Sequence, residues 1–396
     1  MRSFRDIGPG VLIAAAFIGP GTVTLCTIAG ASFGYSLIWA IILSICSTIV
    51  LQEMSLRIGL ITKMNLAQVI RINIKSKFLN RLLLILIISS ILIGNAAYEA
   101  GNITGASLGI SAILNSQSIN YIPVLIGLIA FIVLYQGDYK VLERSLVFLV
   151  LIMSISFFIT AIITKPDINA LINGVITPKI DSNNLTIILG LIGTTVVPYN
   201  LFLHSSLVSE KWNSVNKLKV ARFESFFSIL IGGLVSLSII ITAASVNNKD
   251  VNGVIDLAKG LEPLYGNFAI YFLGIGLFAS GITSSITAPL AAAYVAKSCF
   301  GWKDSLKSGK FRAIWIIILI IGVLVSMVKI NPIEIIKFAQ FSNSLLLPII
   351  AIILLWLINN KNIISSKYSY RYQNILGFFI VIISLILGTK GLISLI

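Results

Sequence analysis

About eleven apolar segments, each long enough to cross a lipid bilayer, recur along this chain. A membrane-spanning helix needs about 20 consecutive apolar residues. The segments lie near residues 8–32, 35–56, 79–112, 119–136, 142–164, 184–208, 222–246, 267–297, 311–328, 335–358 and 372–394. Only 11% of the residues are charged, against about 25% in soluble domains. Because lipid satisfies no backbone hydrogen bonds, we expect a single all-α integral membrane domain over residues 1–396.

Lysine and arginine are distributed unevenly among the connections, which predicts the orientation of the chain. Most of the 29 basic residues fall before residue 8 and in alternate connections near 57–81, 140–144, 211–222, 297–312 and 361–371. Cytoplasmic loops carry an excess of these residues. We therefore expect a cytoplasmic N-terminus, an external C-terminus and a prokaryotic plasma membrane. The net charge of +15 is interpreted as attraction to lipid headgroups, and nucleic acid is not an expected partner.

Two spans contain helix-breaking residues near their centres. Gly19-Pro20-Gly21-Thr22 interrupts the first span, and Val197-Pro198-Tyr199-Asn200 interrupts the sixth. Proline removes a backbone donor and glycine loosens the helix, so each span should form two half-helices. Broken spans at corresponding positions of two halves mark the substrate site of many secondary transporters. This placement predicts a LeuT-type inverted repeat of five plus five helices, over about 8–164 and 184–358, with an extra helix near 372–394.

The motifs around these breaks resemble the NRAMP family of metal transporters. The resemblance continues from the first break into residues 29–35 and from the second break through 193–205. It extends to 276–281 in the eighth span and 339–348 in the tenth, and so covers the first ten spans. It implies a LeuT-type fold, a divalent metal ion as substrate and a proton as candidate co-substrate.

The resemblance fails at the positions that would bind the metal. The family has DPGN in the first break, with Asp and Asn as ligands, where this chain has Gly19 and Thr22. It has MPHN in the second break, where Val197 replaces the methionine and Tyr199 the histidine. The candidate substrate-binding residues are Gly19, Gly21, Thr22, Thr194, Val197, Tyr199, Asn200 and Gln340. Transition ions are usually held by carboxylate, imidazole or sulfur ligands. We therefore assign no metal to this set.

Three further residues are candidates for proton coupling. Glu99 is the acid deepest in an apolar span, and ionisable groups at that depth are usually functional. The resemblance implies that it is the retained family acid and that Asn102 replaces a second one. His204, the only histidine, follows the second break and can carry a proton. The alternative is structural: Glu99 would bond to Tyr98 or Asn102, and His204 would be a satisfied core residue.

These observations predict a secondary transporter that works by alternating access. We find no nucleotide-binding loop and no catalytic constellation, so we expect neither an enzyme nor a cofactor. The substrate is a small inorganic ion or a small solute, and lipid is the other expected partner. One alternative is a carrier of an amino acid-like or anionic solute, which the helix N-termini at the breaks would favour. Another is a non-transporting receptor or scaffold with a degenerate site.

Overall fold

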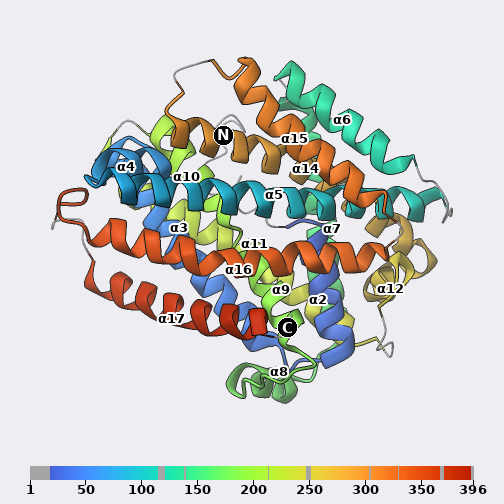
Figure 1. Ribbon diagram of the computed structural model, residues 1–396. Coiled ribbons are helices and arrows are strands. Elements are labelled where there is room, and N and C mark those ends of the chain that lie inside the picture. The colour runs from blue at the N-terminus through green and yellow to red at the C-terminus, as the bar shows by residue number, and fades with distance from the viewer. Residues whose placement is uncertain are drawn as a thin grey trace.

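The chain folds into a bundle of long apolar helices packed side by side (Figure 1). The computed structural model describes residues 18–114, 121–137, 140–212, 214–246, 251–302, 305–328, 330–365 and 370–393, and in these ranges it contains helices and no strands. The long helices are α3 (Ile38–Thr62), α5 (Lys77–Leu114), α6 (Ile122–Gln136), α7 (Lys140–Ile163), α11 (Leu218–Ala244), α14 (Ala269–Phe300), α15 (Gly309–Ser326), α16 (Pro332–Asn359) and α17 (Arg371–Ile393). The half-helices are α2 (Pro20–Phe33), α9 (Leu185–Thr195) and α10 (Pro198–Lys211).

The helices correspond one by one to the predicted membrane spans. Nine helical stretches of the described chain are long and apolar enough to cross a membrane, with α9 and α10 counted as one stretch. The shorter apolar helix α6 and the half-helix α2 occupy the places of the other two spans. The first part of the predicted span 8–32, up to residue 17, lies outside the described residues. The prediction of an all-α membrane protein is confirmed.

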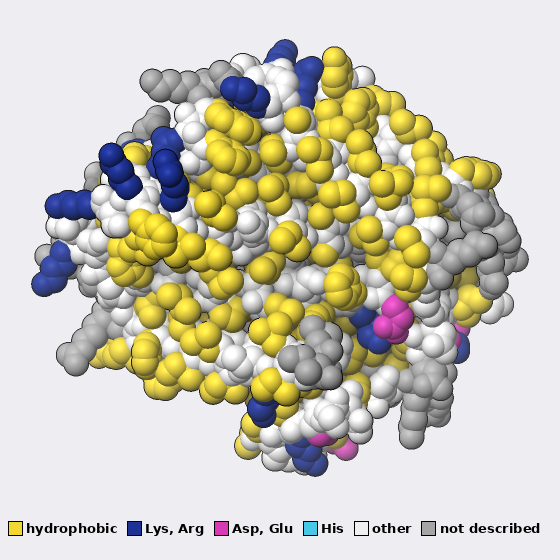
Figure 2. All heavy atoms as spheres, viewed as in Figure 1, with side chains coloured by type: hydrophobic (Ala, Val, Ile, Leu, Met, Phe, Trp, Pro, Cys, Tyr) yellow, Lys and Arg dark blue, Asp and Glu magenta, His cyan; other side chains and the backbone are white. Residues whose placement is uncertain are grey.

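The surface of the bundle is largely apolar, as expected for a protein surrounded by lipid. Large apolar side chains cover most of the face in Figure 2, and many others point outward, such as Phe223 on α11 at 66% exposure. Lys and Arg side chains gather at the left end of this view, beyond the apolar belt. A broad exposed apolar surface would aggregate in water but is stabilised by lipid.

Short helices connect the spans, and the sequence analysis did not predict them. Helix α4 (Leu66–Asn73) begins with a capping box in which Asn65 and Gln68 exchange hydrogen bonds between side chain and backbone. Helix α8 (Ile168–Ile176) begins at Asp167, whose side chain accepts from two backbone amides. Both caps are readable signals of a helix start. Both helices, of 8 and 9 residues, are too short to appear as membrane-spanning apolar segments.

Three of the connections that were predicted to share a side are joined by hydrogen bonds at one end of the bundle. Lys63 Nζ donates to the Trp212 carbonyl at 2.6 Å, and Asn65 Nδ2 donates to Ser298 Oγ at 2.7 Å. These bonds join the α3–α4 connection to the α10–α11 connection and to the last turn of α14, from which the α14–α15 connection leads. At the opposite end, Asn331 Nδ2 donates to the Asn252 carbonyl at 3.3 Å. The alternation of loops inferred from charge therefore agrees with the grouping of the connections.

Glycines allow the half-helices to approach their neighbours closely. A methyl group at Gly30 of α2 would overlap the Ile240 backbone of α11, and one at Gly193 of α9 would overlap the Gln340 backbone of α16. In membranes, small residues of this kind permit backbone contact between helices and so allow tight packing. The two breaks are thereby held in the interior of the bundle, where 94% of the α9–α10 span window is buried.

Candidate substrate site

The first break is the start of helix α2. Gly19 is the N-cap with an extended backbone (φ −111°, ψ −176°), and Pro20 occupies the first helical position. The first amides of a helix have no hydrogen-bond partner within that helix. Proline lacks an N–H group, so at this position it removes no hydrogen bond from the helix. Residues 20–30 of α2 are buried. The break therefore places polar backbone groups inside the bundle.

The second break separates α9 from α10, and both halves are described. Helix α9 ends at Thr195, the extended residue Val197 (φ −80°, ψ 119°) follows, and α10 starts at Pro198. The predicted discontinuity of the sixth span is confirmed. The arrangement repeats that of the first break, with proline again at the first helical position. Carbonyls at the end of α9 and amides at the start of α10 are left for other partners.

A direct hydrogen bond joins the two breaks. Thr22 Oγ1 lies 2.8 Å from Thr194 Oγ1, across 172 residues of sequence. Both side chains are 0% exposed. A hydroxyl has one donor and two acceptor sites, so each oxygen keeps acceptor capacity after this bond forms. The structure thus brings together two of the predicted site residues through their oxygen atoms.

Two buried amide side chains belong to the same elements. Gln340 of α16 packs against Gly21, where a methyl group would overlap its side chain. Asn200 lies in the first turn of α10. Both residues are 1% exposed, and neither Gln340 Oε1 nor either polar atom of the Asn200 amide has a hydrogen-bond partner in the described chain. Buried polar atoms without partners are rare and costly. They are the atoms that a bound ion or polar solute would satisfy.

Two residues outside the predicted substrate-binding set, Tyr98 and Ser284, face Gly19. A Cβ atom added at Gly19 would lie 3.3 Å from Ser284 Oγ and 3.6 Å from the Tyr98 hydroxyl. The Tyr98 ring also packs edge-on against Tyr199, with ring centroids 5.6 Å apart. Hydroxyl groups therefore border the space next to the position where the family pattern has a carboxylate. The sequence offered only weak signals: Tyr98 precedes Glu99, and Ser284 belongs to a polar stretch of α14.

Val197 brings no donor atom to this region. Its side chain is apolar and 1% exposed, and its backbone forms the N-cap of α10. In the described chain, no group of three or more His, Cys, Asp and Glu side chains could hold a metal ion. The side chains at the breaks thus offer neutral hydroxyl and amide oxygens, which suit hard cations such as Mg²⁺ and Mn²⁺ better than soft ones.

Glu99 lies in a separate contact region. Its side chain packs against Gly322 of α15, where a methyl group would overlap it. It is 0% exposed, and Asn102 Nδ2 lies 3.4 Å from its Oε2 atom, a long hydrogen bond. Among the described residues its carboxylate forms no hydrogen bond with either break, although it lies close enough to Tyr199 of the second break to act on it electrostatically. Glu99 is therefore placed beside the candidate site through its neighbour Tyr98, and its own side chain points toward other helices.

His204 is buried against helix α3. Its Nδ1 atom lies 2.8 Å from Gln52 Oε1, and its Nε2 atom has no partner in the described chain. One ring nitrogen thus has the structural bond expected of a core histidine. The other remains available for a proton or a polar ligand.

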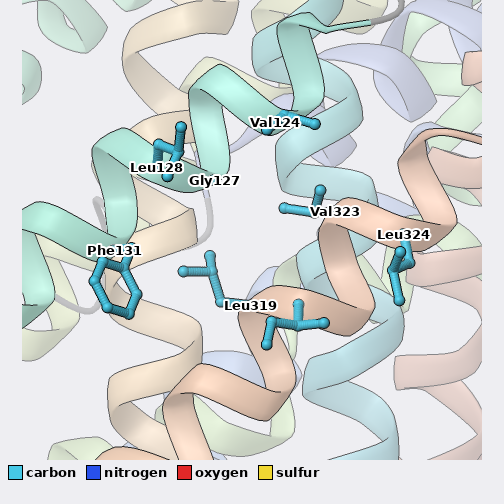
Figure 3. A pocket seen from close by; sticks show the side chains of 8 residues that line it. Val124, Gly127, Leu128, Phe131, Leu319, Val323 and Leu324 are labelled. Atoms are coloured by element: carbon cyan, nitrogen blue, oxygen red, sulfur yellow. The ribbon is translucent and has the colours of Figure 1, made fainter.

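An apolar pocket elsewhere in the bundle differs in character from the break region. It has a volume of about 190 Å³ and lies between α6 and α15, where Gly127, Phe131, Leu319 and Val323 face one another (Figure 3). None of its lining side chains carries a polar atom. An ion or polar solute would gain no partner there, so the breaks are the candidate substrate site.

Comparisons with known proteins agree with this architecture. A family model described as "Natural resistance-associated macrophage protein-like" matches residues 10–394. The divalent metal cation transporter MntH of Staphylococcus aureus (strain JH9) is 29% identical over 419 residues, covering 96% of this chain and 89% of that protein. An Eremococcus coleocola manganese transporter, solved with an aromatic bis-isothiourea substituted compound, has a TM-score of 0.81 at 20% identity and covers 100% of this chain and 87% of that one.

A more distant structure supports the same fold. MhsT in complex with L-phenylalanine has a TM-score of 0.62 at 13% identity, covering 97% of this chain and 98% of that chain. Likeness at this identity concerns the fold alone. The predicted LeuT-type fold is confirmed, and the chain is a multi-pass integral membrane protein.

Proposed function

The chain belongs to the natural resistance-associated macrophage protein (NRAMP) family, and from this premise we propose that it is a secondary transporter of a small hard divalent cation. The ion would bind between the two helix breaks, with Thr22, Thr194, Asn200 and Gln340 supplying neutral oxygen ligands. The single observation that carries the proposal is the pair of threonine hydroxyls that joins the breaks at 2.8 Å. MntH relatives that bear the name of divalent metal cation transporters support the substrate class.

The spacing of the hydroxyl pair suits a small ion. Mg²⁺ holds oxygen ligands octahedrally at about 2.0–2.1 Å, so neighbouring ligand oxygens lie about 2.9 Å apart. The Thr22 and Thr194 oxygens, 2.8 Å apart, need to move little to reach that separation. A Ca²⁺–oxygen distance of about 2.4 Å would require oxygens roughly 3.4 Å apart at the same angle. The spacing is compatible with an ion of the size of Mg²⁺, but it is also the ordinary separation of two hydrogen-bonded hydroxyls, so the choice of ion rests on the neutral oxygen ligands.

The absence of a carboxylate among these four ligands limits how far the ion can be dehydrated. Removing a divalent ion from water is expensive unless opposite charge replaces the water. Mg²⁺ usually keeps several of its waters when bound. We therefore infer a partly hydrated ion held by two to four protein oxygens. Weak binding of this kind suits an ion that is abundant in the medium.

Proton coupling and orientation form the finer part of the proposal. Glu99 is the candidate proton carrier because it is a wholly buried acid with Oε1 unpartnered in the described chain. His204 is a second candidate through its Nε2 atom. The basic connections would face the cytoplasm, together with the N-terminus, and the C-terminus would lie outside. No catalytic step is part of the proposed cycle.

One observation supports a second candidate, a neutral amino acid-like solute. Asn200 has both an amide donor and an amide acceptor without partners in the described chain. A cation satisfies only the acceptor, whereas a solute with donor and acceptor groups satisfies both. The absence of an acid among the proposed ligands is also less costly for a neutral or zwitterionic solute.

Uptake into proteoliposomes tests the proposal. Purified protein is reconstituted with a Mg²⁺- or Mn²⁺-sensitive dye inside the vesicles, and wild type is compared with Asn200→Ala. We expect saturable uptake by wild type and a KM raised about tenfold or more by the variant, in line with the effect of disturbed metal ligation. The matched control is Asn95→Ala, because Asn95 is equally buried but its amide donates to the Ala288 carbonyl at 2.7 Å. This control should lose stability and keep its KM. Absence of uptake of either ion, together with thermal stabilisation by neutral amino acids, would favour the second candidate.

A further inference from the structure

A second pocket, which has one charged end, lies away from the breaks between α3, α11 and α17. Its volume is about 250 Å³, and its lining includes Val50, Glu53, Arg222, Phe226 and Leu376. It combines a charged end with apolar walls. Neither the substrate site nor the proposed coupling residues use any of these side chains.

The charged end of this pocket carries more positive than negative charge. Glu53 Oε2 accepts from Arg57 Nη2 at 3.0 Å, and Glu53 Oε1 accepts from Arg222 Nε at 2.7 Å. Both guanidinium groups lie over the Tyr370 ring, at 5.0 Å for Arg57 and 4.3 Å for Arg222. One carboxylate thus serves two guanidiniums, and this three-residue ion cluster has a net charge of +1.

Only one of the two arginines is accessible to a ligand. The Arg57 side chain is 0% exposed, whereas the Arg222 side chain is 24% exposed and lines the pocket. Arg222 approaches Glu53 Oε1 with both Nε and Nη2, at 2.7 and 2.6 Å, so the Nη1 end of its guanidinium is the part that can serve an anion. A guanidinium is well suited to phosphate, which it binds with two parallel hydrogen bonds.

The positions of the pocket residues near two helix ends lead us to infer that the pocket lies at the depth of the lipid headgroups. Arg222 is the fifth residue of α11, and Gln373 on the pocket wall is the third residue of α17. Both helices have this end beside the connections that are rich in lysine and arginine. Lys219, one turn closer to the end of α11, is exposed. The approach to the pocket from this end is therefore also basic.

The walls of the pocket are suited to an acyl chain. Phe226 and Leu376 are 42% and 52% exposed, although both are apolar and face outward from the bundle. Two neighbouring aromatics on α11, Phe223 and Phe227, extend this surface at 66% and 42% exposure. A lipid chain would cover these side chains, while its phosphate remained at the charged end.

We propose that this pocket binds an anionic phospholipid. The phosphate lies against Arg222, and one acyl chain lies over Phe226 and Leu376. The net positive charge of the Glu53–Arg57–Arg222 cluster selects an anionic headgroup such as phosphatidylglycerol, because the positive choline of phosphatidylcholine would be repelled. The same phosphate chemistry exists in free inorganic phosphate, but the apolar walls assign the site to lipid.

Native mass spectrometry of the full chain in detergent tests this assignment. Protein is mixed with phosphatidylglycerol or phosphatidylcholine, and bound lipid is counted for wild type and Arg222→Gln. We expect retained phosphatidylglycerol on wild type and about tenfold weaker retention on the variant, because charge-assisted hydrogen bonds to phosphate are lost. The matched control is Arg312→Gln, since Arg312 also stacks on a tyrosine, 4.1 Å over Tyr135. This control should retain phosphatidylglycerol like wild type.

A second variant keeps the charges and fills the space. Ser225 lines the pocket, so Ser225→Leu should weaken phosphatidylglycerol binding while the ion cluster stays intact. Inorganic phosphate, added alone, should give no thermal stabilisation. Equal lipid retention by wild type, Arg222→Gln and Ser225→Leu, or stabilisation by inorganic phosphate equal to that by lipid, would overturn the proposal.

Discussion

The hydrogen bond between Thr22 and Thr194 can be tested by a double-mutant cycle. Valine has the shape of threonine without the hydroxyl, so Thr22→Val leaves Thr194 Oγ1 buried without this partner. A buried polar group that loses its partner costs about 1–3 kcal/mol. We expect each single variant to lose stability in that range, because both side chains are 0% exposed. The double variant should lose less than the sum of the two, by about 1 kcal/mol.

The same helix supplies a matched control. Thr24 is also 0% exposed, but its Oγ1 atom has no hydrogen-bond partner in the described chain. Removing a hydroxyl that is already unsatisfied is neutral or stabilising, so Thr24→Val should not lower the free energy of unfolding. The measurement is equilibrium unfolding in detergent micelles. If Thr22→Val costs no more than Thr24→Val, or if the costs of the two site variants simply add, the bond contributes nothing and the reasoning is refuted.

The stabilisation of each variant by Mg²⁺ is a second quantity that the double-mutant cycle can measure. A ligand present at 100 times its Kd stabilises the folded protein by about 2.7 kcal/mol. If Thr22→Val weakens Mg²⁺ binding tenfold, the stabilisation at the same concentration falls to about 1.4 kcal/mol. Thr24→Val should keep the wild-type value. Equal stabilisation of all three proteins by Mg²⁺ would remove Thr22 from the proposed ligands, whatever its effect on stability.

Three further variants test other parts of the site. Glu99→Gln should abolish the dependence of uptake on external pH if Glu99 carries the proton, and an unchanged pH profile would exclude that role. Val197→Met adds a soft thioether ligand and should raise uptake of Mn²⁺ relative to Mg²⁺; competition assays that give an unchanged ratio would place residue 197 away from the ion. Gly21→Ala should lower the free energy of unfolding by about 1–3 kcal/mol, because the added methyl group overlaps the Gln340 side chain. The control is Gly309→Ala, whose methyl group would have no neighbouring atom within 4 Å, and it should leave the free energy of unfolding unchanged in the same assay.

The breaks and the spans could be predicted because their causes are local. Proline at residues 20 and 198 disfavours a helix that continues through it, and the structure has both at a first helical position, whereas Pro289 and Pro348 lie inside α14 and α16. Apolar segments of bilayer length form helices because lipid offers no hydrogen-bond partners to their backbone groups. These features need no knowledge of tertiary contacts. The fold class follows from them together with the corresponding positions of the two breaks.

The contacts within the site could not be predicted, because they depend on how helices turn toward one another. Thr22 and Thr194 are 172 residues apart, and nothing in either local sequence specifies the other. Tyr98 and Glu99 are neighbours, but successive residues of a helix point about 100° apart. Tyr98 therefore approaches Gly19, whereas Glu99 packs against Gly322. The depth of Glu99 in an apolar span and the family resemblance identified it in the sequence, and only packing shows which helices it contacts.

Because the proposed ligands are neutral, we expect that an added negative charge raises the affinity for Mg²⁺ and lowers the turnover rate. Gly19→Asp tests this expectation. A Cβ atom at this position would lie 3.3 Å from Ser284 Oγ, a tight contact from which the serine side chain must shift by a few tenths of an ångström, and 3.6 Å from the Tyr98 hydroxyl. The aspartate would stand at the N-terminus of α2, where the helix dipole favours negative charge. We expect a KM for Mg²⁺ lowered at least about tenfold, equivalent to about 1.4 kcal/mol, and a lower kcat because a tightly held ion leaves slowly. The control is Gly19→Asn, which has the same shape without the charge. If Gly19→Asn changes KM and kcat as Gly19→Asp does, shape rather than charge governs this position, and the argument from the neutral shell fails.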